Sequence, residues 1–401
     1  MSFPACKHRK PKVPSTPSLL TWLASEPFRL FFFSGAVWSV VGVSLWPFFY
    51  AGMLGYYPAY SHARNMIEAF GGAFVVGFLG TAGPRMASAP KLKPWELGWL
   101  FLLHQASAVC HLNLWHAWGD ALFALLLTSL AGSLVMRMLR FRQDPPPPQM
   151  LLALVGLACG IAGALLSLMP ATQVDPQRLR LAGLLLYQGL LLPPVLGIGS
   201  FLFPRMLGGA FGEPKTARQT RVAFIRALAA AVLIMASFVA EAWGLPLSGN
   251  LVRAITCAVY LLTEIRWRRA AGAPARGTLA TGLRIALISG FLGLVLAGLF
   301  TPQRVSLEHL LYISGFGLLM LVVASRVLFG HSGELAGFDR RGGMARWLVG
   351  LVLLAATTRA VTGFLPQLTV SHHIYAALTW ATVALLWLVW NRHRFIKRDE
   401  E

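Results

Sequence analysis

Charged residues are scarce in this sequence. Asp, Glu, Lys and Arg make up 12% of its 401 residues, and hydrophobic residues make up 56%. A soluble domain typically has about 25% charged residues, so this composition indicates an integral membrane protein whose partner is the lipid bilayer. The net charge of +20 does not predict a nucleic-acid partner, because the sequence has no basic helix and no basic surface with interleaved aromatic residues.

Several chemical motifs are also missing. The four cysteines lie far apart and form no CxxC or CxxCH motif, so neither a thiol redox pair nor covalently attached haem is indicated. The sequence contains no nucleophile paired with a base, no pair of catalytic carboxylates and no phosphate-binding loop. We therefore assign no reaction from the sequence, and whether the protein is an enzyme stays open.

Long apolar runs dominate what is present. A helix that crosses a bilayer needs about 20 mostly apolar residues. The runs are continuous and do not alternate with period two, which favours helices over a barrel. They predict an all-α, polytopic helical bundle with about twelve transmembrane helices, at 28–50, 62–82, 96–113, 116–137, 150–170, 180–203, 221–243, 249–265, 281–300, 307–329, 345–363 and 372–391.

The basic residues predict the orientation of this bundle. Most of the 35 Lys and Arg residues lie in the two tails and in alternate links between the apolar runs. The positive-inside rule then places both termini in the cytoplasm and supports an even number of spans. We expect a cytoplasmic basic tail over 1–27, not a cleaved signal peptide, one transmembrane domain over 28–391, and a second cytoplasmic tail over 392–401.

Seven of the ten histidines fall in the outer half of this bundle or at its outer rim. A histidine at the interface is amphipathic and fits at head-group depth without any function. Neutral imidazole is also a common ligand of metals, of haem iron and of copper. A haem between helices needs one or two such histidines and apolar walls. The seven are His62, His104, His111, His116, His309, His372 and His373.

Polar residues in the second and third predicted spans also stand out. Glu68 lies four residues after Arg64, so we expect the two side chains to pair on one helix face. His104 is the histidine most deeply embedded in a span, and it shares a face with His111 two turns later. Polar residues at membrane depth are candidates for function.

Three stretches resemble the NnrS family of bacterial membrane proteins. Residues 307–334 read "LEHLLYISGFGLLMLVVASRVLFGHSGE", similar to a family helix that opens with His and closes with an Arg-x-x-x-Gly-His-x-Gly pattern. Residues 62–86 read "HARNMIEAFGGAFVVGFLGTAGPRM", similar to the family's His-Ala-His-Glu-Met element and the run that follows it. The "EPFRLFFFSG" stretch at 26–35 also resembles an early element of the family.

The resemblance implies a haem- and copper-containing protein of the bacterial inner membrane, linked to nitric oxide metabolism and to protection from nitrosative stress. It implies His62 and His309 as metal-site candidates, with a diatomic such as nitric oxide as the ligand. Further cofactor-binding candidates are His104, His111, His116 and Arg64.

The sequence departs from the family at one motif. Arg64 and Asn65 stand where the family has its second His and its Glu. An arginine cannot be deprotonated in a protein and cannot ligate a metal, which weakens the expectation of copper. Arg64 could instead pair with a haem propionate.

Two other functions fit the sequence. The span count and the break that Pro193 and Pro194 introduce into the sixth span fit a transporter or permease, although the two halves show no clear repeat. Faces of small residues fit a non-catalytic membrane subunit or an assembly factor with a protein partner.

Overall fold

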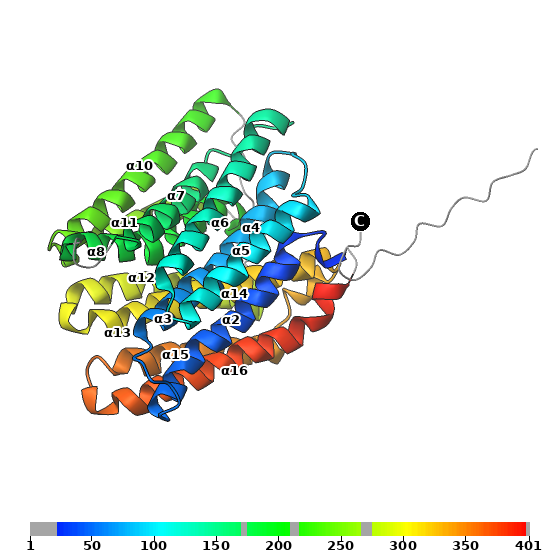
Figure 1. The fold of residues 1–401 in the computed structure, drawn as a ribbon. Helices are drawn as coiled ribbons and strands as arrows, with labels where there is room; N and C mark the ends of the chain where they lie inside the picture. Colours follow the sequence, from blue (N-terminus) through cyan, green and yellow to red (C-terminus); the bar gives the residue numbers. More distant parts are fainter. Residues whose placement is uncertain (1–21, 170–174, 209–215, 266–274, 398–401) are drawn as a thin grey trace, which may run out of the picture.

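The computed structural model describes residues 22–169, 175–208, 216–265 and 275–397 and shows a bundle of long helices (Figure 1). Each predicted span corresponds to one helix or one interrupted helix in this part of the chain, and no strand occurs in it. The polytopic helical fold is therefore confirmed. The uninterrupted helices are α2 (Pro27–Tyr50), α5 (Pro94–Leu112), α6 (His116–Met136), α7 (Met150–Ser167), α10 (Ala217–Ala242), α11 (Pro246–Ile265), α12 (Thr278–Leu299), α15 (Gly343–Val361) and α16 (Thr369–Ile396).

The second, sixth and tenth spans are interrupted by π-helical segments. The structure gives them as α3 (Ala59–Arg64), η1 (Asn65–Gly71) and α4 (Gly72–Met86); α8 (Pro176–Leu184), η4 (Leu185–Gly189) and α9 (Leu192–Met206); and α13 (Arg304–His309), η6 (Leu310–Gly317) and α14 (Leu318–His331). A further π segment, η2 (Arg137–Phe141), extends α6, and three short 3₁₀ turns, η5 (Thr301–Gln303), η7 (Leu335–Gly337) and η8 (Pro366–Leu368), lie in the links. The predicted break in the sixth span lies between η4 and α9, directly before Pro193.

Ten of these spans are long and apolar enough to cross a membrane. The other two, α5 and α11, fall short because they carry polar side chains such as His104 and Asn250. Large apolar side chains are exposed around the outside of the bundle, for example Leu262, Ile288 and Leu385. Apolar side chains of this kind are compatible with contact to lipid, and the hydrogen bonds of each helix satisfy its backbone N–H and C=O groups there. The chain is therefore a multi-pass membrane protein.

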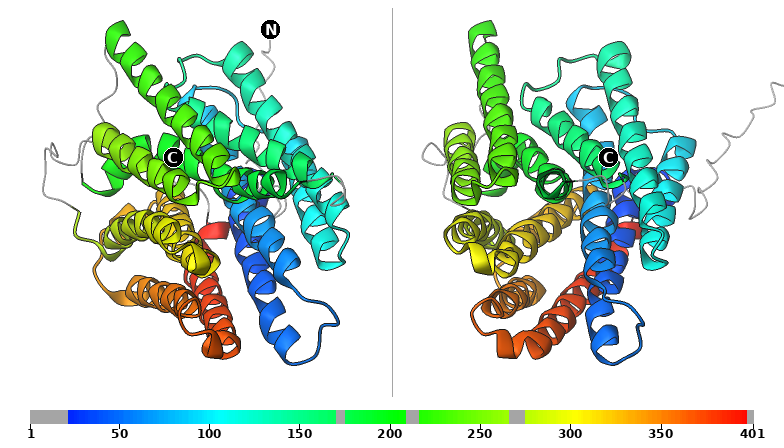
Figure 2. Two further views of the ribbon diagram at one scale, coloured as in Figure 1. Left: turned by 90° about the vertical axis from the view of Figure 1, so that its left-hand side faces the viewer. Right: turned by 60° about the vertical axis from the view of Figure 1, so that its left-hand side comes forward.

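The first and last helices close the bundle. Helix α2 runs beside α16 (Figures 1 and 2), and the buried Arg29 side chain donates from Nη1 to the carbonyl oxygens of Phe395 at 2.6 Å and of Lys397 at 3.2 Å. A cation at a helix C-terminus satisfies carbonyls that have no partner within the helix. The start of α2 and the end of α16 thus lie at the same end of the bundle, as an even number of spans requires.

The last helix is longer than predicted. It continues past 391 to Ile396, into the predicted tail. Arg394 pairs with Glu334 at 2.7 Å and lies over the ring of Phe329, with 4.0 Å between the guanidinium carbon and the ring centroid. These contacts hold the extra turn against the link after α14.

Helix α12 approaches the tenth span closely at Gly293. A Cβ atom there would lie 2.6 Å from the backbone nitrogen of Leu311, two residues after His309. Small residues allow this kind of close approach between membrane helices, so Gly293 helps to place η6 and the histidine before it.

We expect Gly293→Ala to lower the thermal stability of the purified protein, because the backbone of η6 must move to admit the methyl group. Overpacking of this kind costs about 1–3 kcal/mol. Gly350→Ala is the matched control, since nothing lies within 4 Å of a Cβ at that exposed helical position. Equal melting temperatures for the two variants would contradict this account of the packing.

Candidate functional site

A cavity of about 350 Å³, named the main cavity, lies at the end of the bundle where α2 ends and α16 begins. This volume falls within the usual range for small-molecule pockets, about 300–1,000 Å³. Its walls are mostly apolar and aromatic, with Trp46, Phe70, Phe316 and Trp380 among them. Such walls suit a large, flat, apolar ligand.

Three of the interrupted spans contribute their π segments to this cavity. Segment η1 supplies Met66 and Phe70, η4 supplies Tyr187, and η6 supplies Tyr312 and Phe316. A π turn inserts an extra residue into a helix and changes the direction of the side chains that follow, and such turns are frequent at functional sites. Nothing in the sequence predicted these segments.

His62 and His309 both line the cavity. They lie 247 positions apart in the sequence, and the fold brings them to the same cavity. The Nδ1 atom of His62 lies 2.9 Å from the carbonyl oxygen of Gly42, and that of His309 lies 2.6 Å from the carbonyl oxygen of Val305. A carbonyl only accepts hydrogen bonds, so each Nδ1 carries the hydrogen. The Nε2 atom of each neutral ring then keeps its lone pair, as in histidines that ligate metals.

His373 lines the same cavity and was predicted as an outer histidine but not as a site residue. Its Nδ1 atom lies 3.0 Å from the hydroxyl oxygen of Tyr50. The ring of Trp46 packs against both His373 and His62, with centroids 4.8 and 5.9 Å apart. This packing fixes the orientation of two of the three imidazoles.

Charged residues of the cavity wall were missed by the sequence analysis. Arg180 pairs with Glu308 at 2.8 Å and also with Glu241, and both Arg180 and Glu308 line the cavity. Arg359 lines it as well. A usable signal was present for Arg359, because it is an arginine inside the outer end of an apolar run with no acidic residue one helical turn away on either side.

The other predicted site residues do not line the cavity. The nitrogens of His104 are both used within the protein: Nε2 lies 2.8 Å from the carbonyl oxygen of Ala69, and Nδ1 lies 2.8 Å from the amide nitrogen of Gln105. His111 and His116 stack on each other, with ring centroids 5.6 Å apart. Each of these three histidines is held by contacts within the protein.

Arg64 does not line the cavity itself but lies in a buried cluster behind Tyr187, a wall residue to which its Nη1 donates at 3.2 Å. Its Nε atom lies 2.8 Å from Asp120 and 3.4 Å from Glu68, which confirms the predicted pairing of Arg64 with Glu68. His111 lies 3.0 Å from the other oxygen of Glu68. The ligand atoms of Glu68, His111 and Asp120 lie within 4.8 Å of one another, and the guanidinium of Arg64 supplies the positive charge among them.

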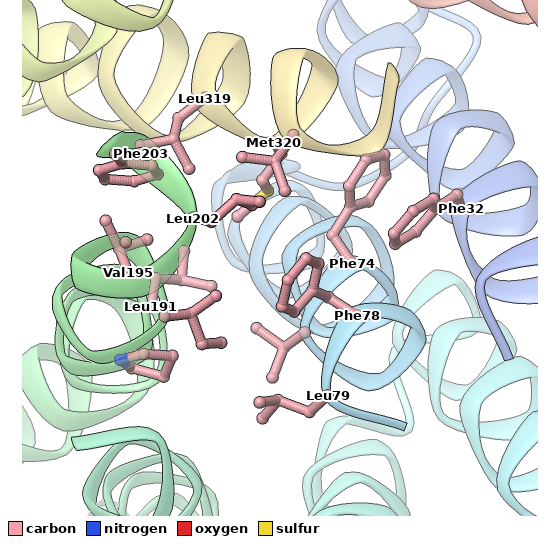
Figure 3. Close-up of a pocket in the computed structure, with 15 residues that line it drawn as sticks. Phe32, Phe74, Phe78, Leu79, Leu191, Val195, Leu202, Phe203, Leu319 and Met320 are labelled. Atoms are coloured by element: carbon pink, nitrogen blue, oxygen red, sulfur yellow. The ribbon is translucent and has the colours of Figure 1, made fainter. Parts of the chain in front are cut away.

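A smaller, wholly apolar pocket adjoins the main cavity. It has a volume of about 70 Å³ and lies between α4, α9 and α14, with Phe74, Leu202 and Phe203 among its walls (Figure 3). Leu191 and Met320 line both this pocket and the main cavity. The two spaces are therefore separated by side chains alone.

A comparison with models of known protein families gives one match. The sequence model of the family described as NnrS protein matches residues 22–397. This range runs from before α2 to beyond the end of α16 and includes every residue of the cavity. None of the curated proteins matches the chain.

We expect Arg64→Met to destabilise the protein strongly, because it leaves the buried carboxylates of Glu68 and Asp120 without their cation. Removing one partner of a buried ion pair costs about 3–5 kcal/mol, measurable as a lower melting temperature in detergent. The triple variant Arg64→Met, Glu68→Gln, Asp120→Asn should recover most of this loss. Arg178→Met is the control, since its pair with Asp175 is exposed and worth about 0–1 kcal/mol. Wild-type stability in Arg64→Met would refute the assignment.

Proposed function

The chain belongs to the NnrS protein family, and on this premise we propose that it is a haem-binding protein of the bacterial inner membrane that acts in nitric oxide metabolism or in protection from nitrosative stress. The main cavity is the proposed haem site. From the positive-inside rule we infer that this cavity lies in the outer half of the membrane. Bound haem would supply an iron that binds a diatomic ligand.

The observation that carries this proposal is the hydrogen bonding of two histidines. His62 and His309 come from different spans, line one cavity, and each turn Nδ1–H toward a backbone carbonyl. The Nε2 lone pairs are left for a metal. The hydrogen bond from Nδ1 to the carbonyl fixes the orientation of each ring and makes its Nε2 atom a stronger metal ligand. Iron in haem is commonly held by such a neutral imidazole.

The walls of the cavity fit a haem in their chemistry. Aromatic and aliphatic side chains from α2, η1, η6 and α16 surround the two imidazoles, and they would exclude water from both faces of a macrocycle. A dry, apolar surrounding is one of the means by which a protein sets the properties of haem. Two arginines, Arg180 and Arg359, also line the wall, and Arg180 is already paired with Glu241 and Glu308.

We do not extend the proposal to copper. The position of the family's second histidine is occupied by Arg64, which cannot ligate a metal. The carboxylates around it are already neutralised by the guanidinium. Copper bound at Glu68, His111 and Asp120 would have to displace this buried cation, at a large cost in stability.

We expect His62→Ala and His309→Ala, made separately, to lower haem affinity by roughly tenfold or more, since even indirect partners of a ligand contribute about 10–100-fold. The measurement is the Soret absorption band and the iron content of protein purified after expression with added haem. His372→Ala is the matched control, because His372 is an outer histidine that does not line the cavity. Well-folded wild-type protein without haem and without metal would overturn the proposal.

A further inference from the structure

Arg359 differs from the other arginines of this half of the bundle in its partners. Arg64, Arg180, Arg253 and Arg304 each have a carboxylate oxygen within ion-pair distance, at 2.8, 2.8, 2.9 and 3.8 Å. The Nη1 atom of Arg359 donates instead to two hydroxyl oxygens, Ser306 Oγ at 3.0 Å and Thr362 Oγ1 at 2.7 Å. Across the described ranges of the chain, no carboxylate pairs with it.

Arg359 is half-buried in the last turn of α15, where its side chain lines a mostly apolar and aromatic wall. A guanidinium stays charged under all ordinary conditions, and a charge in an apolar surrounding is expensive unless it is paired. Hydroxyl groups orient their dipoles toward the charge but do not neutralise it. Glu308 is the one carboxylate among the described residues of the cavity wall, and Arg180 already binds it at 2.8 Å.

The place of Arg359 shows where a counter-charge could come from. Its side chain lines the same cavity as His62, His309 and His373. Arginine presents its N–H groups in a planar fork that matches a carboxylate, and such pairs are short and strong. An anion carried by the ligand would satisfy the charge that the protein leaves open.

We propose that Arg359 anchors a carboxylate of the cavity ligand, which in a haem is a propionate. This inference rests on the proposed function and adds to it the residue that recognises the acidic edge of the ligand. The sequence had suggested Arg64 for that role. The structure pairs Arg64 with Glu68 and Asp120, whereas Arg359 lines the cavity and has no acidic partner among the described residues.

The test compares two forms of the ligand. Purified haem-free protein is titrated with haem and, separately, with haem dimethyl ester, whose carboxylates are blocked, and both affinities are read from the Soret band. Wild type should prefer haem by about 10- to 100-fold, the contribution of a charge-assisted hydrogen-bonded pair. Arg359→Gln should abolish this preference while binding the ester as wild type does. Arg359→Lys, which keeps the charge without the planar fork, should retain part of it.

Arg304→Gln is the matched control. Arg304 lies 3.9 Å from Glu241 and 3.8 Å from Glu308, the two carboxylates that pair with Arg180, and it does not line the cavity. This variant should therefore keep the full preference for haem. Arg359→Gln with the wild-type preference would overturn the role of Arg359 and leave the haem site standing. Wild type that binds neither form would overturn the proposed function and this inference with it. If Arg359→Gln does not fold, an Arg359→Lys variant with the full wild-type preference overturns the inference.

Discussion

A polar group inside a bilayer must find its partner within the protein, because the hydrocarbon offers none. This constraint organises the structure around its few charges. Arg64 pairs with Glu68 and Asp120, Arg253 pairs with Glu241, and Arg180 joins Glu241 to Glu308. Most of these pairs link different spans. The few acidic residues of the sequence are thus placed where they can neutralise these three arginines. Arg29 follows the same rule with carbonyl oxygens at the end of α16.

The main cavity is where this constraint is not met by the protein alone. There the Nε2 atoms of His62 and His309 keep their lone pairs, and Arg359 has hydroxyl partners but no carboxylate from the part of the chain that the structure describes. Elsewhere His104 shows the contrasting pattern, with both ring nitrogens bonded inside the bundle. A ligand with a metal centre and an acidic edge would complete both kinds of group at once. The proposed haem site and the proposed role of Arg359 follow from this single pattern.

Much of the fold could be predicted from the sequence, because continuous apolar runs and the placement of basic residues follow directly from the bilayer. The pairing of Arg64 with Glu68 was also predictable, since it depends on spacing along one helix. The π segments η1, η4 and η6 were not, because they depend on how neighbouring spans pack rather than on local sequence. The family resemblance set His62 and His309 apart from His104 and His111, but spacing alone could not show that the first two line one cavity and the other two do not. For Arg359 the sequence shows only that its own helix offers no acidic partner nearby. That no other span supplies a carboxylate, among the described residues, is visible only once the spans are placed.

The most direct test of this account is a structure of the haem-loaded protein determined by electron cryomicroscopy in a lipid nanodisc. The account predicts a macrocycle in the main cavity, against Trp46 and Trp380, with iron bound to Nε2 of His62 or His309 and a propionate at Arg359. Haem bound elsewhere on the protein, or the main cavity filled by lipid in a haem-loaded sample, would contradict it.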